Sequence, residues 1–431
     1  MSIFTNIPAI LRIMIVFILV VICIRRKLSL GNAFMLGAIS LSLLFGLKPH
    51  TMLKSMAFSM IDPKTVSIAV IVSLILILSN SMEAAGQMKR LLDRFQGLVS
   101  SPRLNLVIFP ALIGLLPMPG GAVFSAPMVK ELGADSKLSQ PQLSFINYWF
   151  RHIWEHWWPL YPGIILVTIM TDISLLTIVA IMCPFTVIAV ILGYLILKDS
   201  AQSRKIDKDV ERSPVWPFLK ELMPVLIVII PGLAMGIILS MLFPAFSVSK
   251  EVGLILALCL SIIWAWFENG TSNSQIFQML TARSLLKMIY MIIAILIFKG
   301  ILTDSNAAVI AGQELVQLHV PLMAIVIMLP FIIGLSGGIV IAFVGSTFPI
   351  LLPLIDSLGH PEFLLAYVML VLSCGFAGVM LSPLHLCFQL SNEFFETTMG
   401  AVYRLLWLPC LSLIGVSVLY FWLLSWILQW I

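Results

Sequence analysis

Long apolar stretches alternate with short polar segments along the whole chain. At about 20 residues per crossing of a bilayer, this pattern predicts helices near 7–24, 28–47, 65–82, 143–170, 173–197, 215–243, 252–267, 284–301, 363–390 and 405–430. Two further apolar stretches, 112–128 and 332–353, are interrupted by Gly and Pro near their middle. Because Gly permits tight turns and Pro stops helices, each is expected to fold back at mid-depth. These are predicted re-entrant hairpins, at about 104–129 and 320–355.

The composition agrees with a membrane protein. The 431 residues are 60% hydrophobic and 10% charged, with a mean hydropathy of +1.08, which excludes an ordinary water-soluble domain. The six cysteines lie in apolar stretches and have no metal or disulfide spacing. The first apolar stretch ends in Arg25-Arg26-Lys27 rather than in a small-residue cleavage site, so it is expected to remain as a transmembrane helix.

The loop charges predict the topology. The net charge of +5 lies in short loops between apolar stretches, where basic residues orient helices rather than bind nucleic acid. With Arg25-Arg26-Lys27 in the cytoplasm and neither hairpin crossing, the loops richest in Lys and Arg all fall on the cytoplasmic side. A crossing at 112–128 would instead place the basic segment 198–213 outside. The positive-inside rule therefore favours two hairpins that do not cross.

The two halves of the chain repeat one order of elements: three helices, a hairpin, a broken helix and a last helix. Pro110 and Gly114 before the first hairpin correspond to Pro330 and Gly334 before the second, offset by 220 in both cases. Residues 1–197 and 215–431 are predicted to be inverted repeats, joined by a charged cytoplasmic linker at 198–214. The predicted fold class is an all-α polytopic membrane protein with two inverted-topology repeats. It contains about 10 transmembrane helices, two re-entrant hairpins and two discontinuous helices.

The hairpin tips are candidate ligand sites, because irregular backbone inside a bilayer persists only where it is buried in protein or lines an aqueous cavity. Free N–H groups at such tips attract anions, and carbonyls at helix C-termini suit Na⁺. The candidates are Pro119, Gly120, Gly121 and Ser125 in the first hairpin, and Ser336, Gly337, Gly338, Ser346 and Thr347 in the second. The alternative is a pair of kinked structural helices with close GxxG-type packing.

Ionisable residues gather at the centre of the predicted fourth helix, in the sequence NYWFRHIWEHWWPLYP. Charge at this depth is unfavourable, so function is the first hypothesis. Arg151 and Glu155 are spaced i, i+4 and can pair along one face, and His152 and His156 repeat that spacing on the adjacent face. In the functional interpretation, this stretch from Asn147 onward binds substrate. Arg151 grips a carboxylate, and Glu155 or a histidine takes up a coupled proton. In the alternative, the Arg151/Glu155 pair only fixes helix packing.

The matching helix of the second half, predicted at 363–390, also contains residues that break helices. We expect a break at mid-membrane that polar side chains face. The residues involved are Ser373, Gly375, Gly378, Ser382, Pro383 and His385. Packing of small residues explains the glycines equally well, but it does not explain His385 and Pro383 together.

The sequence HIWEH at 152–156 also fits the inverted zinc-peptidase motif, in which two His bind zinc and Glu activates water. So short a pattern is a weak match, and the next acidic residues, Asp172 and Glu221, lie at the ends of predicted helices. The chain has no nucleotide-binding motif.

Three segments, LIGLLPMPGGAVFSAPMV, FINYWFRHIWEHWWPLYPG and LSPLHLCF, resemble an uncharacterised prokaryotic membrane family, domain of unknown function 401, over essentially the whole chain. In architecture the chain more distantly resembles the ion-transporter superfamily of gluconate, lactate, citrate and dicarboxylate permeases. The resemblance implies inverted repeats whose hairpin tips and helix breaks form substrate and cation sites. On this chain these sites map to a subset of the candidates above: Pro119, Gly120, Gly121 and Ser125, the stretch from Asn147 to His156, Ser336, Gly337 and Gly338, and Ser373, Gly375 and Ser382. The Ser-Asn-Thr tip signature of dicarboxylate carriers is absent here.

We therefore expect a secondary active transporter of a small organic anion, coupled to Na⁺ or H⁺, and not an enzyme. The hairpin-bearing part is expected to move against a scaffold of the remaining helices. The expected location is the prokaryotic cytoplasmic (inner) membrane, with both termini outside. The expected partners are the anion and the bilayer; no nucleic acid, resident metal or other cofactor is expected, and a homodimer is left open. The alternatives are a Na⁺/H⁺ antiporter using Glu155, an intramembrane zinc peptidase and a passive channel.

Overall fold

Helices form almost all of the structure. The computed structural model describes residues 7–95, 98–99, 101–118, 120–134, 138–197, 214–246, 248–318, 321–358 and 361–430, and these contain no strand. The elements are α1 (Ala9–Arg25), α2 (Leu30–Leu44), α3 (Pro49–Ile61), α4 (Pro63–Ala84), α5 (Gln87–Phe95), α6 (Pro102–Ile113), α7 (Ala122–Gly133), α8 (Gln140–Arg151), α9 (Pro162–Thr171), α10 (Leu175–Met182), α11 (Pro184–Leu197), α12 (Val215–Leu242), α13 (Ser249–Glu268), α14 (Asn273–Leu280), α15 (Arg283–Asp304), α16 (Ala307–Gln317), α17 (Leu322–Gly337), α18 (Val340–Ser357), the 3₁₀ turn η1 (Pro361–Phe363), α19 (Leu364–Met380), α20 (Leu386–Phe394) and α21 (Met399–Leu428).

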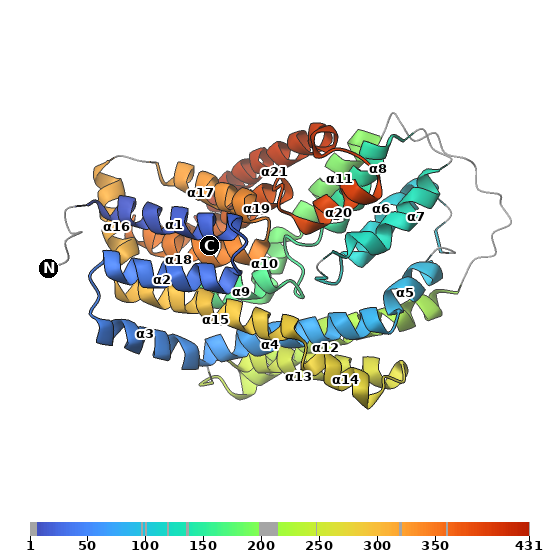
Figure 1. Ribbon diagram of the computed structural model, residues 1–431, viewed down its shortest axis with the longest axis horizontal. Helices are drawn as coiled ribbons and strands as arrows, with labels where there is room; N and C mark the ends of the chain where they lie inside the picture. The colour runs from blue at the N-terminus through green and yellow to red at the C-terminus, as the bar shows by residue number, and fades with distance from the viewer. Residues whose placement is uncertain are drawn as a thin grey trace.

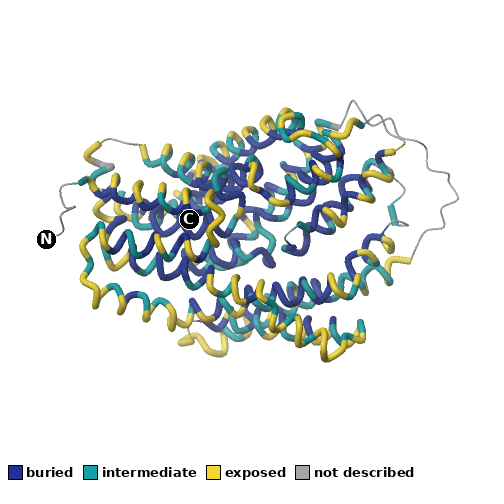
Figure 2. The backbone as a smooth tube through the Cα atoms, viewed as in Figure 1, coloured by how far each residue is buried: buried dark blue, intermediate teal, exposed yellow. Residues whose placement is uncertain are grey.

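Eight helical segments of the described chain are long and apolar enough to cross a membrane. They are Pro63–Ala84, Leu175–Ile196, Val215–Leu242, Ser249–Glu268, Asn273–Asp304, Val340–Ser357, Pro361–Met380 and Met399–Leu428. Large apolar side chains such as Met241, Phe267 and Trp426 point outward from these helices, and Figure 2 shows buried backbone enclosed by more exposed helices. An apolar exterior of this kind is suited to lipid, which indicates a multi-pass membrane protein.

Polar side chains close the first turn of many helices. Ser29, Asp62, Ser174 and Thr398 each accept a hydrogen bond from a backbone N–H three residues later, as N-cap residues do. At α1 the cap comes from elsewhere in the chain. The Glu314 carboxylate of α16 accepts the N–H groups of Ala9 and Ile10, and this negative charge complements the helix N-terminus.

The helices divide into two groups by their contacts. The first, which we call the frame, contains α1–α5 and α12–α16; the second, the hairpin group, contains α6–α11 and α17–α21. In Figure 1, α3, α4 and α12–α14 lie along the lower edge, and α6–α8, α11, α20 and α21 lie on the upper side. The two groups meet chiefly where α18 contacts α15 and α16, where α17 contacts α1, and where α9 contacts α4. Each group draws helices from both halves of the chain.

The order of elements recurs at a nearly constant offset. α4 and α15 begin at Pro63 and Arg283 and end at Ala84 and Asp304, so both ends differ by 220. α5 and α16, and α6 and α17, begin 220 residues apart, while α8 and α19 begin 224 apart. Contacts between the halves are reciprocal: α2 packs on α15 and α13 on α4, and α7 packs on α20 and α18 on α9.

The structure corrects the sequence expectations in two places. Four short helices, α3, α5, α14 and α16, occupy segments taken as loops. The two segments predicted as discontinuous helices are each divided, 143–170 into α8 and α9 and 363–390 into α19 and α20. The second break does not involve Gly375 or Gly378, because α19 continues through both to Met380. Pro119 and residues 198–213 of the predicted linker lie outside the described residues.

Candidate functional site

The first helix break separates α8 from α9. α8 begins with a capping box made by Ser139 and Gln142, and its last residue is Arg151. The chain then passes through a series of turns until Pro162 starts α9. Pro159 and Pro162 lack backbone N–H groups and disfavour helix in the residue before each of them. A continuous helix through this segment is therefore disfavoured.

The side chains of this break bind the end of α6 and the turn of the first hairpin. Where α6 stops, its last carbonyls lose their partners within the helix. Four side-chain donors, from Arg151 and the break, bind one carbonyl of this helix end and three carbonyls of the turn that follows it, each 2.7 or 2.8 Å from its acceptor oxygen. The pairs are Trp154 Nε1 with the carbonyl of Ala111, Tyr161 Oη with Gly114, Trp158 Nε1 with Leu115, and Arg151 Nη2 with Met118. The tryptophans interpreted from the sequence as packing residues are thus hydrogen-bond donors to the hairpin.

Two glycines of the first hairpin make room for Arg151. A Cβ atom at Gly114 would lie 1.9 Å from the backbone oxygen of Arg151, and one at Gly121 would lie 2.3 Å from its Nη2. Gly120 has a positive φ of 77°, and a Cβ there would meet Leu390 of α20. The predicted tip of the first hairpin is therefore a turn, and it touches both the first break and the second discontinuous helix.

Arg151 is buried, with 2% of its surface exposed. Within the described chain it has no ion pair, and its Nε has no hydrogen-bond partner. The predicted i, i+4 pair with Glu155 does not form, because α8 ends at Arg151 and the two residues are not on one helical face. The Oε2 atom of Glu155 also has no partner among the described residues. The structure therefore buries both charged groups without joining them.

Two histidines from opposite halves of the chain meet beside Arg151. The Nε2 atoms of His152 and His385 are 3.1 Å apart, and Nη1 of Arg151 is 3.5 Å from the same nitrogen of His152. Nδ1 of His152 lies 2.6 Å from the carbonyl oxygen of Tyr148. His156 is elsewhere: its ring packs 3.9 Å from that of Phe376 and hydrogen-bonds to none of the described residues. His152 and His156 therefore do not form the adjacent pair expected from their spacing.

A network of amides and hydroxyls continues the site toward α7 and α20. Asn147 accepts a hydrogen bond from Ser125 Oγ at 2.6 Å and donates to Ser391 Oγ at 2.9 Å. Ser144 Oγ donates to the Asn392 side-chain oxygen at 2.7 Å. All five side chains are buried. This network joins the first hairpin, α8 and the second discontinuous helix.

The second hairpin turns next to the second break. Gly338 ends α17 with a positive φ of 66°. A Cβ there would lie 2.9 Å from the backbone nitrogen of His385 and 2.9 Å from Oγ of Ser382. Ser382 Oγ accepts the N–H of Leu384 and so holds the turn that replaces the helix at Pro383. Ser336, half-buried, and Gly337, buried, complete the end of α17. This tip was predicted from the sequence.

Four other candidates are bound within helices. Hydroxyls of Ser346, Thr347 and Ser373 donate to carbonyls of their own helices, a common arrangement for helical Ser and Thr. Gly375 faces the ring of Phe343, which would lie 2.3 Å from an added Cβ. Gly375 therefore supports close helix packing, the alternative that the sequence left open.

The sequence did not single out Tyr148, Cys387, Ser391 or Asn392 as functional residues. Tyr148 Oη donates to the carbonyl of Met380 at the end of α19, and Cys387 lies close to His152 and His385. The available signal was the spacing His385-x-Cys387 directly after the predicted break. Their partners lie more than 200 residues away along the chain, so spacing alone could not reveal the contacts.

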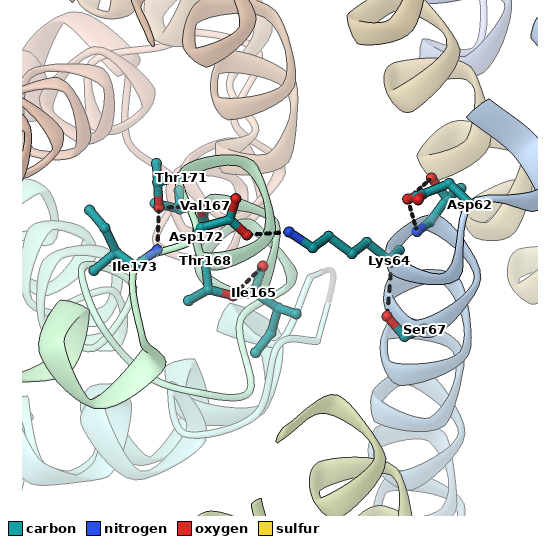
Figure 3. Close-up of polar contacts among 10 residues, drawn as sticks. Asp62, Lys64, Ser67, Ile165, Val167, Thr168, Thr171, Asp172 and Ile173 are labelled. Carbon is teal, nitrogen blue, oxygen red and sulfur yellow. Dashed lines mark hydrogen bonds and ion pairs between the residues drawn. The ribbon is translucent and has the colours of Figure 1, made fainter. Parts of the chain in front are cut away.

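A separate crevice of about 380 Å³ opens between the frame and the hairpin group. Helices α4, α9, α10, α12 and α13 line this crevice. Arg151, His152 and His385 are not among its lining residues. At this crevice Lys64 of α4 pairs with Asp172, the C-cap of α9 (Figure 3). This ion pair links the frame to the element that follows the first break.

The chain matches a family model described as "Protein of unknown function (DUF401)" over residues 9–424. No curated protein matches it. The protein belongs to this family of unknown function.

Proposed function

We propose that this member of a family of unknown function is a secondary active transporter of a small organic anion, coupled to Na⁺ or H⁺. The observation that carries the proposal is the buried, unpaired guanidinium of Arg151. An uncompensated charge inside a membrane protein is strongly unfavourable. A carboxylate ligand held by the free edge of the guanidinium would neutralise it in a bidentate, charge-assisted contact.

The helical hairpins support a site at mid-membrane. α6 and α7 have 12 residues each, about 18 Å of helix, whereas the hydrocarbon core is about 30 Å thick. α17 has 16 residues and ends at Gly338, whereas α18, with 18 residues, is long enough to cross a membrane, so the second re-entrant hairpin is proposed from the loop charges. In the proposed topology both pairs are re-entrant. Their tips would meet the two helix breaks near the middle of the membrane, where a bound solute is shielded from the water on both sides.

The recurring offset and the reciprocal contacts support inverted repeats. A two-fold axis in the membrane plane exchanges equivalent helices, so a contact of α2 with α15 requires one of α13 with α4, and both are present. The N-terminal and C-terminal halves would then have opposite orientation, as the loop charges favour. In this topology both termini lie on the non-cytoplasmic side of the prokaryotic inner membrane.

The division into frame and hairpin group supports alternating access. The proposed site lies entirely within the hairpin group, while the crevice lies between the two groups. Movement of the hairpin group against the frame would carry the site from one side to the other. The buried Glu155 carboxylate, with Oε2 unpaired, is the group proposed to take up the coupling Na⁺ or H⁺.

The first test is a ligand screen followed by one substitution. Purified protein is screened by thermal shift against carboxylates, sugar acids and inorganic anions, with and without Na⁺. A ligand at 100 times its dissociation constant stabilises by about 2.7 kcal/mol. The best anion is then measured by counterflow in proteoliposomes for the wild type and Arg151→Lys. We expect Arg151→Lys to lower transport at least about tenfold, because a point charge cannot replace the planar fork and a charge-assisted hydrogen bond is worth about 1.5–3 kcal/mol.

The control is Arg12→Lys, which changes another buried guanidinium, in α1 of the frame. Its Nη1 donates to Leu44, and we expect transport to be kept. Wild-type kinetics in Arg151→Lys would refute the assigned role. Exchange that needs no anion on the opposite side would instead indicate a channel.

The unpaired Glu155 also favours a second candidate, a Na⁺/H⁺ antiporter on the same architecture. The two candidates differ in what Glu155→Gln removes. For an antiporter, all Na⁺-driven proton movement is lost and no anion shifts the melting temperature. For the anion carrier, the anion still shifts the melting temperature of Glu155→Gln through Arg151, while coupling is lost.

A further inference from the structure

Three side chains that commonly bind metal ions converge where α8 ends and α20 begins. One donor atom from each of His152, His385 and Cys387 lies within 4.8 Å of the others. All three residues are at least 93% buried, with exposures of 1%, 7% and 4%. We propose that they bind one thiophilic transition-metal ion, Cu⁺ or Zn²⁺, across the two halves of the chain.

His152 is already oriented as a ligand. Its Nδ1 lies 2.6 Å from the carbonyl oxygen of Tyr148, and because a carbonyl can only accept, Nδ1 carries the hydrogen. In the neutral ring the lone pair is then on Nε2, which faces His385 Nε2 at 3.1 Å. A backbone carbonyl behind the distal nitrogen is the usual outer partner of metal-bound histidine. The 3.1 Å separation is close to that of two nitrogens sharing an ion at about 2.0–2.1 Å from each.

His385 and Cys387 are held together by the start of α20. His385 is the N-cap of this helix, and Cys387 lies in its first turn, where the helix N-terminus stabilises a negative charge. The second hairpin fixes this start, because Gly338 packs against the backbone nitrogen of His385. Two imidazoles and one thiolate form a set that suits zinc and copper rather than Mg²⁺ or Ca²⁺, which prefer oxygen.

The neighbouring charge bears on which ion is bound. Arg151 Nη1 lies 3.5 Å from His152 Nε2, so a net positive site would be repelled by the guanidinium. Cu⁺ with one thiolate is neutral and accepts three ligands, whereas Zn²⁺ with one thiolate retains a positive charge and an open fourth position. Of the two ions, the structure therefore favours Cu⁺.

This site is distinct from the HIWEH motif and stands apart from the transport proposal. The motif requires His152 and His156 as ligands, but the His156 ring packs against that of Phe376 and is not in the cluster. Metal binding is measured on purified protein without any transport assay, so a failure to bind metal leaves the transport proposal intact. A failure to transport any anion likewise leaves the metal proposal intact.

The test is metal titration of purified, chelator-treated protein in detergent. Cu⁺ is added under anaerobic, reducing conditions in competition with a chromogenic chelator. Co²⁺ is added separately as the spectroscopic stand-in for Zn²⁺, since a thiolate ligand gives it a charge-transfer band. We expect one equivalent of one of these ions to bind and to raise the melting temperature. Cys387→Ser should weaken binding about 100-fold or more, because loss of an outer partner alone costs 10–100-fold.

The controls separate ligands from bystanders. Cys23→Ser removes another buried thiol, packed in α1 beside Val20 and Ala33, and should bind like the wild type. His156→Phe keeps the ring packing and should also bind like the wild type. The metal-free melting temperature of Cys387→Ser reports whether the variant folds, and His385→Gln provides a second ligand variant.

Binding of neither ion at one equivalent would overturn the proposal and leave a proton-sharing histidine pair. Loss of binding in His156→Phe with retention in Cys387→Ser would overturn it in favour of the peptidase motif.

Discussion

The two helix breaks have the same place in the chain order but different chemistry. The first, between α8 and α9, carries Arg151, His152, Glu155 and His156 with three tryptophans. The second, between α19 and α20, is five residues long and contributes Ser382 and His385. Breaks at corresponding places in the chain order therefore differ in both length and side chains. One break supplies most of the polar donors, and the other supplies a tightly packed turn.

The breaks also differ in how their free carbonyls are satisfied. The end of α6 is bonded by side chains of the adjoining break, including Tyr161 Oη to Gly114. The end of α19 is bonded by tyrosines of other helices, with Tyr148 Oη donating to Met380 and Tyr403 Oη to Leu381. The first hairpin and first break therefore form one unit. The second break depends on helices α8 and α21.

The largest difference between the two regions should appear when a methyl group is added. Gly114→Ala places a Cβ 1.9 Å from the Arg151 backbone oxygen, which no side-chain rotation can relieve. We expect a loss of about 3 kcal/mol or more in stability, at the upper end of overpacking effects. Gly338→Ala combines a 2.9 Å contact with a positive φ, and we expect a smaller loss of about 2 kcal/mol.

Thermal unfolding in detergent measures both variants. The matched control is Gly86→Ala, which has a φ of +64° but no atom within 4 Å of the added Cβ, so it isolates the backbone strain. Equal melting temperatures for Gly114→Ala and Gly415→Ala, an open helical position, would contradict the close contact at the first break.

Removal of a single hydroxyl should also lower stability more at the first break than at the second. Tyr161→Phe leaves the buried carbonyl of Gly114 without its donor, which costs about 1–3 kcal/mol. Tyr403→Phe removes the corresponding bond to Leu381 from a half-buried ring, where water or a headgroup can replace it, so we expect less than about 1 kcal/mol. Melting temperatures of the two variants give the comparison. A larger loss in Tyr403→Phe would reverse our ranking of the two regions.

The smallest effect on stability is expected at the crevice. Lys64 joins the frame to the end of the first discontinuous helix through Asp172, and both side chains are about a third or more exposed. Lys64→Ala should change stability by less than about 1 kcal/mol but raise the counterflow rate a few-fold, because it removes a link between the proposed moving parts. Lys220→Ala breaks a similar pair with Glu268 inside the frame and should change neither. Equal rates in the wild type and both variants would argue against the link.

The sequence predicted those features that depend on local residues. Gly120 and Gly338 adopt positive φ at the predicted tips, and the second break occurs at Pro383, because Gly and Pro act through their own backbone. The same reasoning failed for Gly375 and Gly378, where a Cβ would meet Phe343 or the Phe331 oxygen. There the glycines serve helix packing, which depends on a neighbour that the sequence does not name.

Contacts between the halves could not be read from the sequence. The ion pair expected from the spacing of Arg151 and Glu155 assumed a continuous helix, but the helix ends at Arg151. The ring nitrogen that lies 3.1 Å from Nε2 of His152 belongs to His385, 233 residues away. Short helices such as α5 and α16 were missed because their 9 and 11 residues are too few for a membrane span.

The meeting of His152 and His385 bears on how the protein is made. Synthesis delivers α8 to the membrane long before α20 exists, so for that interval the imidazole of His152 has no counterpart and the donors around it face an unfinished interior. The contacts of the first half with His385 therefore stay unformed until the last quarter of the chain has been made. Maturation of the polar centre is thus a late event in biogenesis, whatever the order in which the apolar spans enter the lipid.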